Sequence, residues 1–311
     1  MSVDVELRKR ATLRSVEACP DELPTPDDQT APSLPTGRSL ELPGRGTTFI
    51  REVTGPPNAP VLMLLHGWSS TADLNWHRSY DPLGQRFRVI ALDHRGHGRG
   101  LRCDRRFRLE DCADDAVAVA DALGIDEFIP VGYSMGGPVA SLVWKQHRAR
   151  VTGLVMCATS QRFNDTRSRR AGFTILNGTS ALASLGPFRS VGRLSGAAWS
   201  HRLERRGDAA WMIEQILRHD WTQVLAAGHA IGRFDSSPWI GEVDVPTAVV
   251  ATRSDEIVST RSQLELASAL PGALLQIVDG GHTACSDSAG HFVAALMNAC
   301  LSVTRPVALT A

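Results

Sequence analysis

One stretch of the chain decides the fold prediction: FIPVGYSMGGPVASLVWKQ, residues 128–146. Its first part reads as a short apolar strand and its second part as a helix, so Ser134 lies on the turn between them. The glycines Gly132 and Gly136 let the strand and the helix pass closely, and a serine on such a strained turn presents its hydroxyl. This context favours a nucleophilic serine at Ser134 over a plain Gly/Ser turn.

Short apolar runs alternate with longer helical stretches on both sides of Ser134. The alternation is typical of a parallel sheet with crossover helices, and the nearly continuous apolar runs predict burial on both faces. We therefore expect an α/β fold with a mostly parallel central sheet flanked by helices. The predicted strands are 47–53, 61–65, 88–92, 128–131, 151–157, 247–252 and 273–278, and the predicted helices are 109–123, 137–146, 262–270 and 291–303.

The same pattern divides the chain into four parts. Residues 1–46 are rich in Pro, Gly, Asp and Thr over their second half, which predicts a flexible leader. Residues 47–160 and 245–311 carry the strand and helix pattern and are the predicted first and second parts of the core. Residues 161–244 lack a strand pattern but hold many apolar positions, so we expect an inserted helical cap over the site that the sheet builds.

Composition narrows the possible partners. The chain has 33 Lys and Arg against 33 Asp and Glu, so no overall field attracts it to nucleic acid or to anionic lipid. No stretch approaches the length of a membrane span, and no signal-peptide pattern opens the chain. The six cysteines form no CxxC motif, which is typical of a reducing compartment. We expect a cytoplasmic protein with a small-molecule partner and no stable membrane insertion.

A serine nucleophile needs a base, and the base needs a carboxylate that orients it. Asp255 follows the predicted strand 247–252, and His282 follows the next strand after two glycines. Parallel sheets place ligand sites at the carboxyl ends of their strands, so we expect Asp255 as the acid and His282 as the base. Glu256 and Asp165 are the alternative positions for the acid.

An oxyanion would be held by two backbone N–H groups. The residue after the serine, Met135, provides one, and Trp68 in the loop after strand 61–65 is the predicted second donor. His66 is expected to brace this loop rather than to titrate. The segment from Asp93 to Gly100 pairs His94 with His97, but no Cys or carboxylate joins them, which favours a structural turn over a metal site. We expect neither a metal nor a cofactor.

Taken together, the motifs GYSMGG, HGW and DHRGHGRG, the Asp255 strand end and the Gly-Gly-His282 turn resemble the α/β-hydrolase superfamily. The resemblance covers about residues 47–301, and it is to the serine-nucleophile, carboxylesterase- and lipase-like branch with a helical cap. It implies Ser134 as nucleophile, His282 as base, Asp255 as acid, and Met135 with Trp68 as oxyanion donors. Haloalkane dehalogenases and epoxide hydrolases carry an aspartate at the elbow, so Ser134 distinguishes the chain from both.

The predicted reaction is hydrolysis of a carboxylic ester, of small hydrophobic or acyl-chain type, through an acyl-enzyme. A thioesterase, an acyltransferase and a C–C bond hydrolase use the same triad and are alternatives. A non-catalytic protein of the same fold that binds a small ligand is the alternative of another class. The sequence leaves open the substrate, the oligomeric state and the role of residues 1–46.

Overall fold

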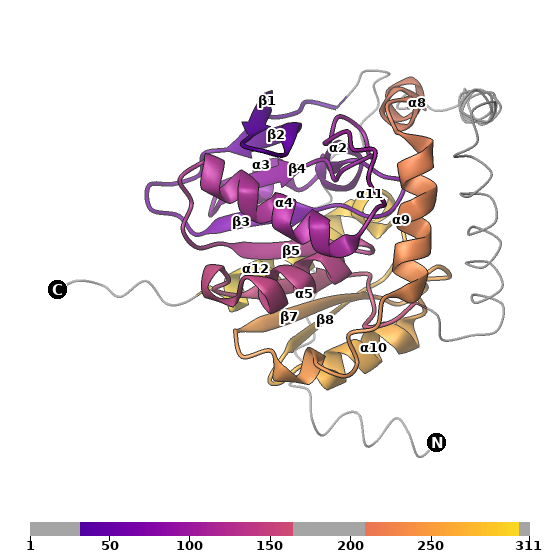
Figure 1. Cartoon of the computed structure of the whole chain (residues 1–311). Helices are drawn as coiled ribbons and strands as arrows, with labels where there is room; N and C mark the ends of the chain where they lie inside the picture. Colours follow the sequence, from indigo (N-terminus) through magenta and orange to yellow (C-terminus); the bar gives the residue numbers. More distant parts are fainter. Residues whose placement is uncertain (1–31, 164–208, 305–311) are drawn as a thin grey trace, which may run out of the picture.

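The computed structural model describes residues 32–163 and 209–304 (Figure 1). Eight strands of this part form one sheet in the order β1-β2-β4-β3-β5-β6-β7-β8. Strand β2 is antiparallel to β1 and β4, and all other neighbours are parallel, which confirms the mostly parallel sheet. The strands are β1 (Gly37–Leu42), β2 (Gly46–Val53), β3 (Val61–Leu65), β4 (Arg88–Leu92), β5 (Ile129–Tyr133), β6 (Leu154–Cys157), β7 (Thr247–Thr252) and β8 (Leu274–Val278).

Helices cover both faces of the sheet, so the central strands are apolar throughout. In β3, Leu62 and Leu64 join one buried cluster while Met63 and Leu65 join the other, as alternation along a strand requires. The first face carries α2 (Ala72–Trp76), α3 (Tyr80–Gly84), α11 (Ala284–Asp287) and α12 (Ala289–Ser302), and the second carries α4 (Leu109–Ala122), α5 (Gly136–Gln146) and α10 (Thr260–Ala269).

The leader prediction is wrong at its C-terminal end, because β1 lies within it. Strand β1 forms an antiparallel hairpin with β2, and the Arg45 N–H donates to the Leu42 carbonyl at 2.9 Å in the turn. Gly44 has a φ of +72° and Gly46 of +111°, which explains the Pro/Gly-rich sequence as a hairpin turn. Leu42 is buried in the core and anchors the strand. Residues 1–31 of the predicted leader lie outside the described residues.

The described half of the predicted cap is helical. It contains α8 (Ala209–Leu217), α9 (Trp221–Arg233) and a short 3₁₀ turn, η3 (Ile240–Glu242). Asp220 caps α9 by accepting the N–H groups of Thr222 and Gln223. Helix α8 contacts α2 and helix α9 contacts α4, so both lie beside the sheet edge where the strands end (Figure 1). The rest of the predicted cap, residues 164–208, lies outside the described residues.

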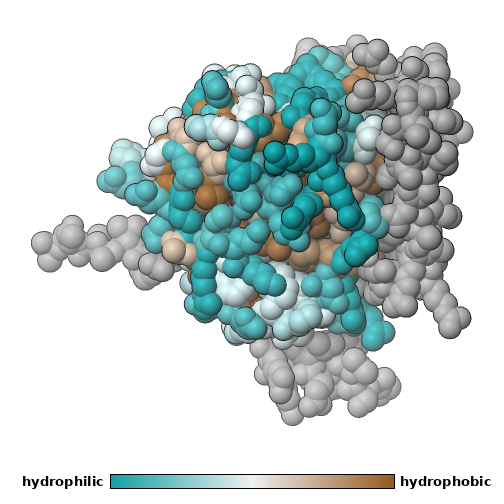
Figure 2. Space-filling model, viewed as in Figure 1, coloured by the Kyte–Doolittle hydropathy of each residue, from teal (hydrophilic) through white to brown (hydrophobic). Residues whose placement is uncertain are grey.

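Figure 2 shows the hydropathy of one face of the molecule. There the described residues are mainly hydrophilic, and hydrophobic residues appear as separate areas between them. Across residues 32–163 and 209–304, no helix is long and apolar enough to cross a membrane.

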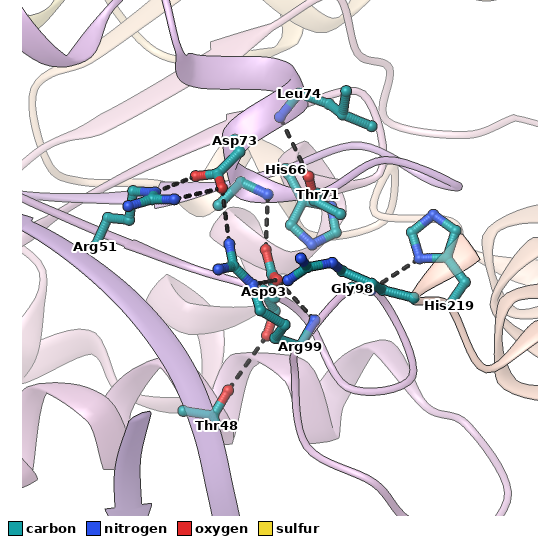
Figure 3. A network of polar contacts seen from close by, with 12 residues as sticks. Thr48, Arg51, His66, Thr71, Asp73, Leu74, Asp93, Gly98, Arg99 and His219 are labelled. Carbon is teal, nitrogen blue, oxygen red and sulfur yellow. Dashed lines mark hydrogen bonds and ion pairs between the residues drawn. The ribbon is translucent and has the colours of Figure 1, made fainter. Parts of the chain in front are cut away.

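A network of charged residues ties strand β2 to the loops after β3 and β4 (Figure 3). Asp73, in the first turn of α2, accepts from both Nε and Nη2 of Arg51 on β2, and from Nη2 of Arg99 at 2.7 Å. Asp93, directly after β4, accepts the N–H of Ala72 at 2.9 Å and that of Arg99 at 2.8 Å. Both carboxylates are fully buried, and we call these four charged residues the Asp73–Asp93 network. Burial raises the pKa of Asp93, although the N–H groups of Arg99 and Ala72 oppose this.

We predict that Asp73→Asn lowers the free energy of unfolding by about 3–5 kcal/mol, because it leaves the buried Arg51 guanidinium without its carboxylate. Arg261→Ala is the control, since Arg261 and Glu265 form an exposed pair with side chains 86% and 39% accessible. Such a pair contributes about 0.2–1 kcal/mol. Urea denaturation of both variants measures the difference, and similar losses in the two would contradict the prediction.

Candidate active site

Ser134 lies on a sharp turn between β5 and α5, as the sequence predicts. Its φ is +52°, a left-handed conformation that is strained for a residue with a side chain. A Cβ at Gly132 would collide with the Gly136 carbonyl, and a Cβ at Gly136 would collide with the Leu65 carbonyl of β3. The two glycines therefore allow the helix to start directly against the strands, and this close approach forces the turn at Ser134.

The backbone of Ser134 is also tied to the next strand. Its N–H donates to the Cys157 carbonyl at 2.9 Å, at the end of β6. Its carbonyl accepts the Thr159 hydroxyl at 2.7 Å and the Gly137 N–H at 2.9 Å. These bonds fix both sides of the strained residue, which as a whole is 8% accessible.

Asp255, His282 and Ser134 lie in a hydrogen-bonded row. His282 Nδ1 lies 2.8 Å from Asp255 Oδ2, and His282 Nε2 lies 2.9 Å from Ser134 Oγ. Because a carboxylate only accepts, Nδ1 carries the proton of the neutral ring and Nε2 is free to accept the serine proton. The arrangement can therefore move a proton from Ser134 Oγ to His282.

Asp255 is held as a carboxylate. Burial raises the pKa of Asp255. Hydrogen bonds from His282, Val258 and Thr252 and the charge of His282 lower it by more, so the pKa lies below its ordinary value. The side chain itself is fully buried, and every bond to it supports the charged form. Besides His282, its donors are the N–H groups of Ile257 and Val258, the Thr252 hydroxyl and the Gln263 amide.

The other sequence candidates for the acid are placed differently. Glu256 is exposed, and Asp165 lies outside the described residues. His282 is held from behind by a residue that the sequence analysis did not single out: the Tyr133 hydroxyl donates to the His282 carbonyl at 2.7 Å. Tyr133 directly precedes Ser134, so the end of β5 positions the backbone of the base as well as the nucleophile.

The two backbone segments that carry the predicted oxyanion donors lie next to Ser134. Met135 directly follows it, and Gly67, next to Trp68, is so near that a Cβ there would lie 3.3 Å from the Ser134 Cβ. Within the described residues, neither the Met135 N–H nor the Trp68 N–H has an acceptor, whereas the Gly67 N–H donates to Asn75 Oδ1 at 2.7 Å. Two unpaired N–H groups beside a serine hydroxyl can bind a negatively charged oxygen.

The Trp68 side chain connects this loop to the described part of the predicted cap. Its indole N–H donates to the Val224 carbonyl of α9 at 2.6 Å. A Cβ at Gly228, one turn further along α9, would lie 2.7 Å from the indole ring, so only glycine leaves room there. Helix α9 thus fixes the position of Trp68.

Behind the loop lies a cluster of buried histidines. His66 braces the loop as expected: its Nδ1 contacts the Gly67 carbonyl at 2.7 Å, and its Nε2 accepts the His94 N–H at 2.9 Å. The His66 ring centroid lies 4.4 Å from that of His94 and 5.4 Å from that of His97, and His97 lies 5.5 Å from His219. Among the residues that the structure describes, no group of His, Cys, Asp and Glu is arranged to hold a metal ion.

Burial keeps these histidines neutral. It lowers the pKa of His66 to about 3 and that of His219 to about 4, and it places those of His94 and His97 well below the ordinary value. His219 lies between α8 and α9, and its Nδ1 accepts the Gly98 N–H at 2.8 Å. The neutral form of His219 therefore joins this segment to the loop after β4 (Figure 3).

Comparison with known proteins agrees with this geometry. Residues 60–289 match the family described as the alpha/beta hydrolase fold. The chain is 26% identical over 230 residues to RutD of Agrobacterium fabrum, a protein named as a candidate carbamate hydrolase, covering 72% of this chain and 85% of that protein. It is 33% identical over 116 residues to epoxide hydrolase B of Mycobacterium tuberculosis, covering 36% of this chain and 32% of that protein. A solved esterase from Thermogutta terrifontis shares the fold with a TM-score of 0.69 and 21% identity, covering 87% of this chain and 100% of that one.

The histidine cluster predicts a pH-dependent stability. An unfolded histidine binds a proton below about pH 6.5, whereas the folded His219 does so only near pH 4. The contribution of the neutral histidine to the free energy of unfolding is therefore fully present above pH 6.5. It falls as the pH drops toward 4, by up to about 1.4 kcal/mol per pH unit for each such group. His219→Asn keeps an acceptor near the Gly98 N–H and cannot be protonated, so we expect a shallower slope of unfolding free energy against pH.

The matched control for this slope is His291→Asn, because His291 is exposed on α12. We expect His291→Asn to leave the slope of the unmodified chain unchanged between pH 7 and 4. Equal slopes for His219→Asn and the unmodified chain would show that His219 does not contribute.

Proposed function

Because the chain belongs to the α/β hydrolase family, we propose that it is a serine hydrolase that cleaves carboxylic esters through an acyl-enzyme. The observation that carries the proposal is the row from Asp255 through His282 to Ser134, with distances of 2.8 and 2.9 Å. A serine, a base and an orienting carboxylate in hydrogen-bond contact make up the arrangement that activates a hydroxyl for attack on a carbonyl.

Each atom of the site has a step in the proposed mechanism. His282 Nε2 takes the proton of Ser134 Oγ as the oxygen attacks the carbonyl carbon, and the N–H groups of Met135 and Trp68 stabilise the resulting oxyanion. His282 then gives its proton to the leaving alcohol. Water, deprotonated by the same ring, attacks the acyl-serine, and His282 returns the proton to Ser134 Oγ as the acid is released. Asp255 stabilises the His282 imidazolium whenever it forms. These reaction steps require no metal or cofactor.

The identity of the nucleophile indicates which bond the enzyme cleaves. An epoxide hydrolase of this superfamily has an aspartate at the elbow, and this chain has Ser134, so the similarity to epoxide hydrolase B does not favour that reaction. A serine forms acyl intermediates, which fits an ester. Carbamate cleavage is a second candidate, since the similarity to RutD spans 85% of that protein and a carbamate carbonyl undergoes the same two steps.

The residues around the site favour a substrate with an apolar part. The Trp68 ring and the described helices of the predicted cap lie beside the loop that follows β3. Pockets with such surroundings bind small hydrophobic or acyl-chain groups through apolar contact. Thioesters, acyl transfer and C–C cleavage use the same triad and are distinguished by substrate tests rather than by the triad.

Ser134→Ala tests the proposal. We expect the unmodified protein to release p-nitrophenol from acetate to octanoate esters, with a burst in proportion to enzyme, and the variant to lose kcat by about 10⁴- to 10⁶-fold without a burst. The acyl-length profile separates short-chain from long-chain specificity. Absence of burst and turnover on every ester, with turnover of a p-nitrophenyl carbamate, would replace the ester assignment by the carbamate one.

Asp255→Asn tests the role of the acid. We expect kcat to fall by about 10³- to 10⁴-fold with little change in KM, because an amide lets His282 adopt the wrong tautomer. The control is Glu256→Gln, since Glu256 is the exposed neighbour and, among the described residues, its side chain forms no hydrogen bond with Ser134, Asp255 or His282. Steady-state kinetics on the same ester measures both, and a comparable loss in Glu256→Gln would reopen the identity of the acid.

A further inference from the structure

Asn75 connects the loop of Trp68 to the helix that follows His282. It lies on α2 and is 7% accessible. Its Oδ1 accepts the Gly67 N–H at 2.7 Å, and its Nδ2 donates to Cys285 Sγ on α11 at 3.5 Å. Neither the triad nor the proposed oxyanion donors include Asn75, yet it contacts the neighbours of both.

The contact with Gly67 determines which N–H of this loop is free. Gly67 and Trp68 are consecutive, and this stretch of backbone passes beside the nucleophile, since a Cβ on Gly67 would lie 3.3 Å from the Ser134 Cβ. Asn75 takes the Gly67 N–H, while the Trp68 N–H has no acceptor in the part of the chain that the structure describes. A buried N–H without a partner costs about 1–3 kcal/mol, so without Asn75 the loop would gain by turning the Gly67 N–H toward another acceptor.

We propose that Asn75 is the positioning residue of the oxyanion hole: by holding the Gly67 N–H, it keeps the Trp68 N–H directed at the oxygen that becomes negatively charged. This inference rests on the proposed serine-hydrolase function. Asn75 itself touches no reacting atom and acts through the backbone of Gly67.

The surroundings of α2 make Asn75 suited to this role. The helix has only five residues, and such a short helix is not stable by itself. Thr71 caps it by accepting the Leu74 N–H, and Asp93 accepts the Ala72 N–H at 2.9 Å. Asp73 is held by two arginines in the Asp73–Asp93 network (Figure 3). Buried charges therefore fix the helix that carries the Asn75 side chain.

The expected effect lies in the chemical step. Removal of a whole oxyanion donor costs about 10²- to 10³-fold in kcat, and a displacement of about 1 Å can cost about 10²-fold. Asn75→Leu leaves the donor in the chain but releases the loop that carries it. We expect kcat on p-nitrophenyl butyrate to fall about 10- to 100-fold, while KM changes less than about threefold.

Cys285→Ala is the matched control. It removes the hydrogen bond that Asn75 donates to α11 and leaves the Asn75 acceptor for the Gly67 N–H in place. We expect kcat to stay within about threefold of the unmodified enzyme. Asn75→Ala is the second variant in case leucine prevents folding, and thermal unfolding shows that each variant is folded at the assay temperature.

Inhibitors that react with Ser134 distinguish a weaker oxyanion hole from a general loss of folded enzyme. A trifluoromethyl ketone adds to Ser134 and forms a tetrahedral oxyanion, so its Ki should rise in Asn75→Leu by the same factor by which kcat/KM falls. The rate of Ser134 labelling by a fluorophosphonate should fall similarly, because charge develops on the phosphoryl oxygen. This labelling requires no ester turnover, so it tests the inference even if the natural substrate is not an ester.

The outcomes are distinct. Unmodified enzyme that neither labels nor turns over any ester or carbamate refutes the proposed function. Active unmodified enzyme with unchanged kcat, Ki and labelling rate in both Asn75 variants refutes the role of Asn75. Equal losses in Asn75→Leu and Cys285→Ala would also overturn it, because they would assign the effect to packing of α2 on α11.

Discussion

The close approach of α5 to the strands β3 and β5 is the constraint on which the site depends. Gly132 and Gly136 have no Cβ, so the helix starts in contact with the backbone of both strands. The chain can make this approach only through a tight turn, and Ser134 therefore adopts a φ of +52°. Hydrogen bonds to Cys157 and Thr159 hold the strained residue in place. The same geometry that packs the helix on the sheet thus raises the hydroxyl above the strand ends.

A second constraint acts on the loops, which the sheet alone does not order. The loops after β3 and β4 meet at the Asp73–Asp93 network, where carboxylates without solvent contact accept from arginines and backbone N–H groups. An arrangement of the loops that separates one of these buried charges from its partner leaves the charge uncompensated, so it is strongly disfavoured. On the other side, α9 holds the Trp68 indole. The position of the Trp68 N–H thus depends on buried charge, on a cap helix and on Asn75 together.

Much of the site could be predicted because strand ends are visible in the sequence. Ser134, Asp255 and His282 each follow an apolar run, and a parallel sheet brings these ends to one edge, so the row follows from topology. Asn75 had no such signal, since its contact with Gly67 depends on where a five-residue helix lies. The hairpin of β1 was missed for another reason: Pro and Gly mark both a flexible leader and a tight turn, and only the pairing with β2 distinguishes them.

His66 and His282 lie close to the same loop, but they differ in burial and in their contacts. His66 is fully buried, and its pKa of about 3 keeps it neutral, so it serves as a fixed donor and acceptor between Gly67 and His94. The His282 side chain is 19% accessible, its Nδ1 lies 2.8 Å from Asp255 Oδ2, and its Nε2 lies 2.9 Å from Ser134 Oγ. Of these two histidines, His282 has a ring nitrogen in contact with the Ser134 hydroxyl, whereas both ring nitrogens of His66 contact the backbone. A charged His66 would place a competing positive charge beside the oxyanion loop and break the bond to the His94 N–H, so its burial protects the geometry of the loop.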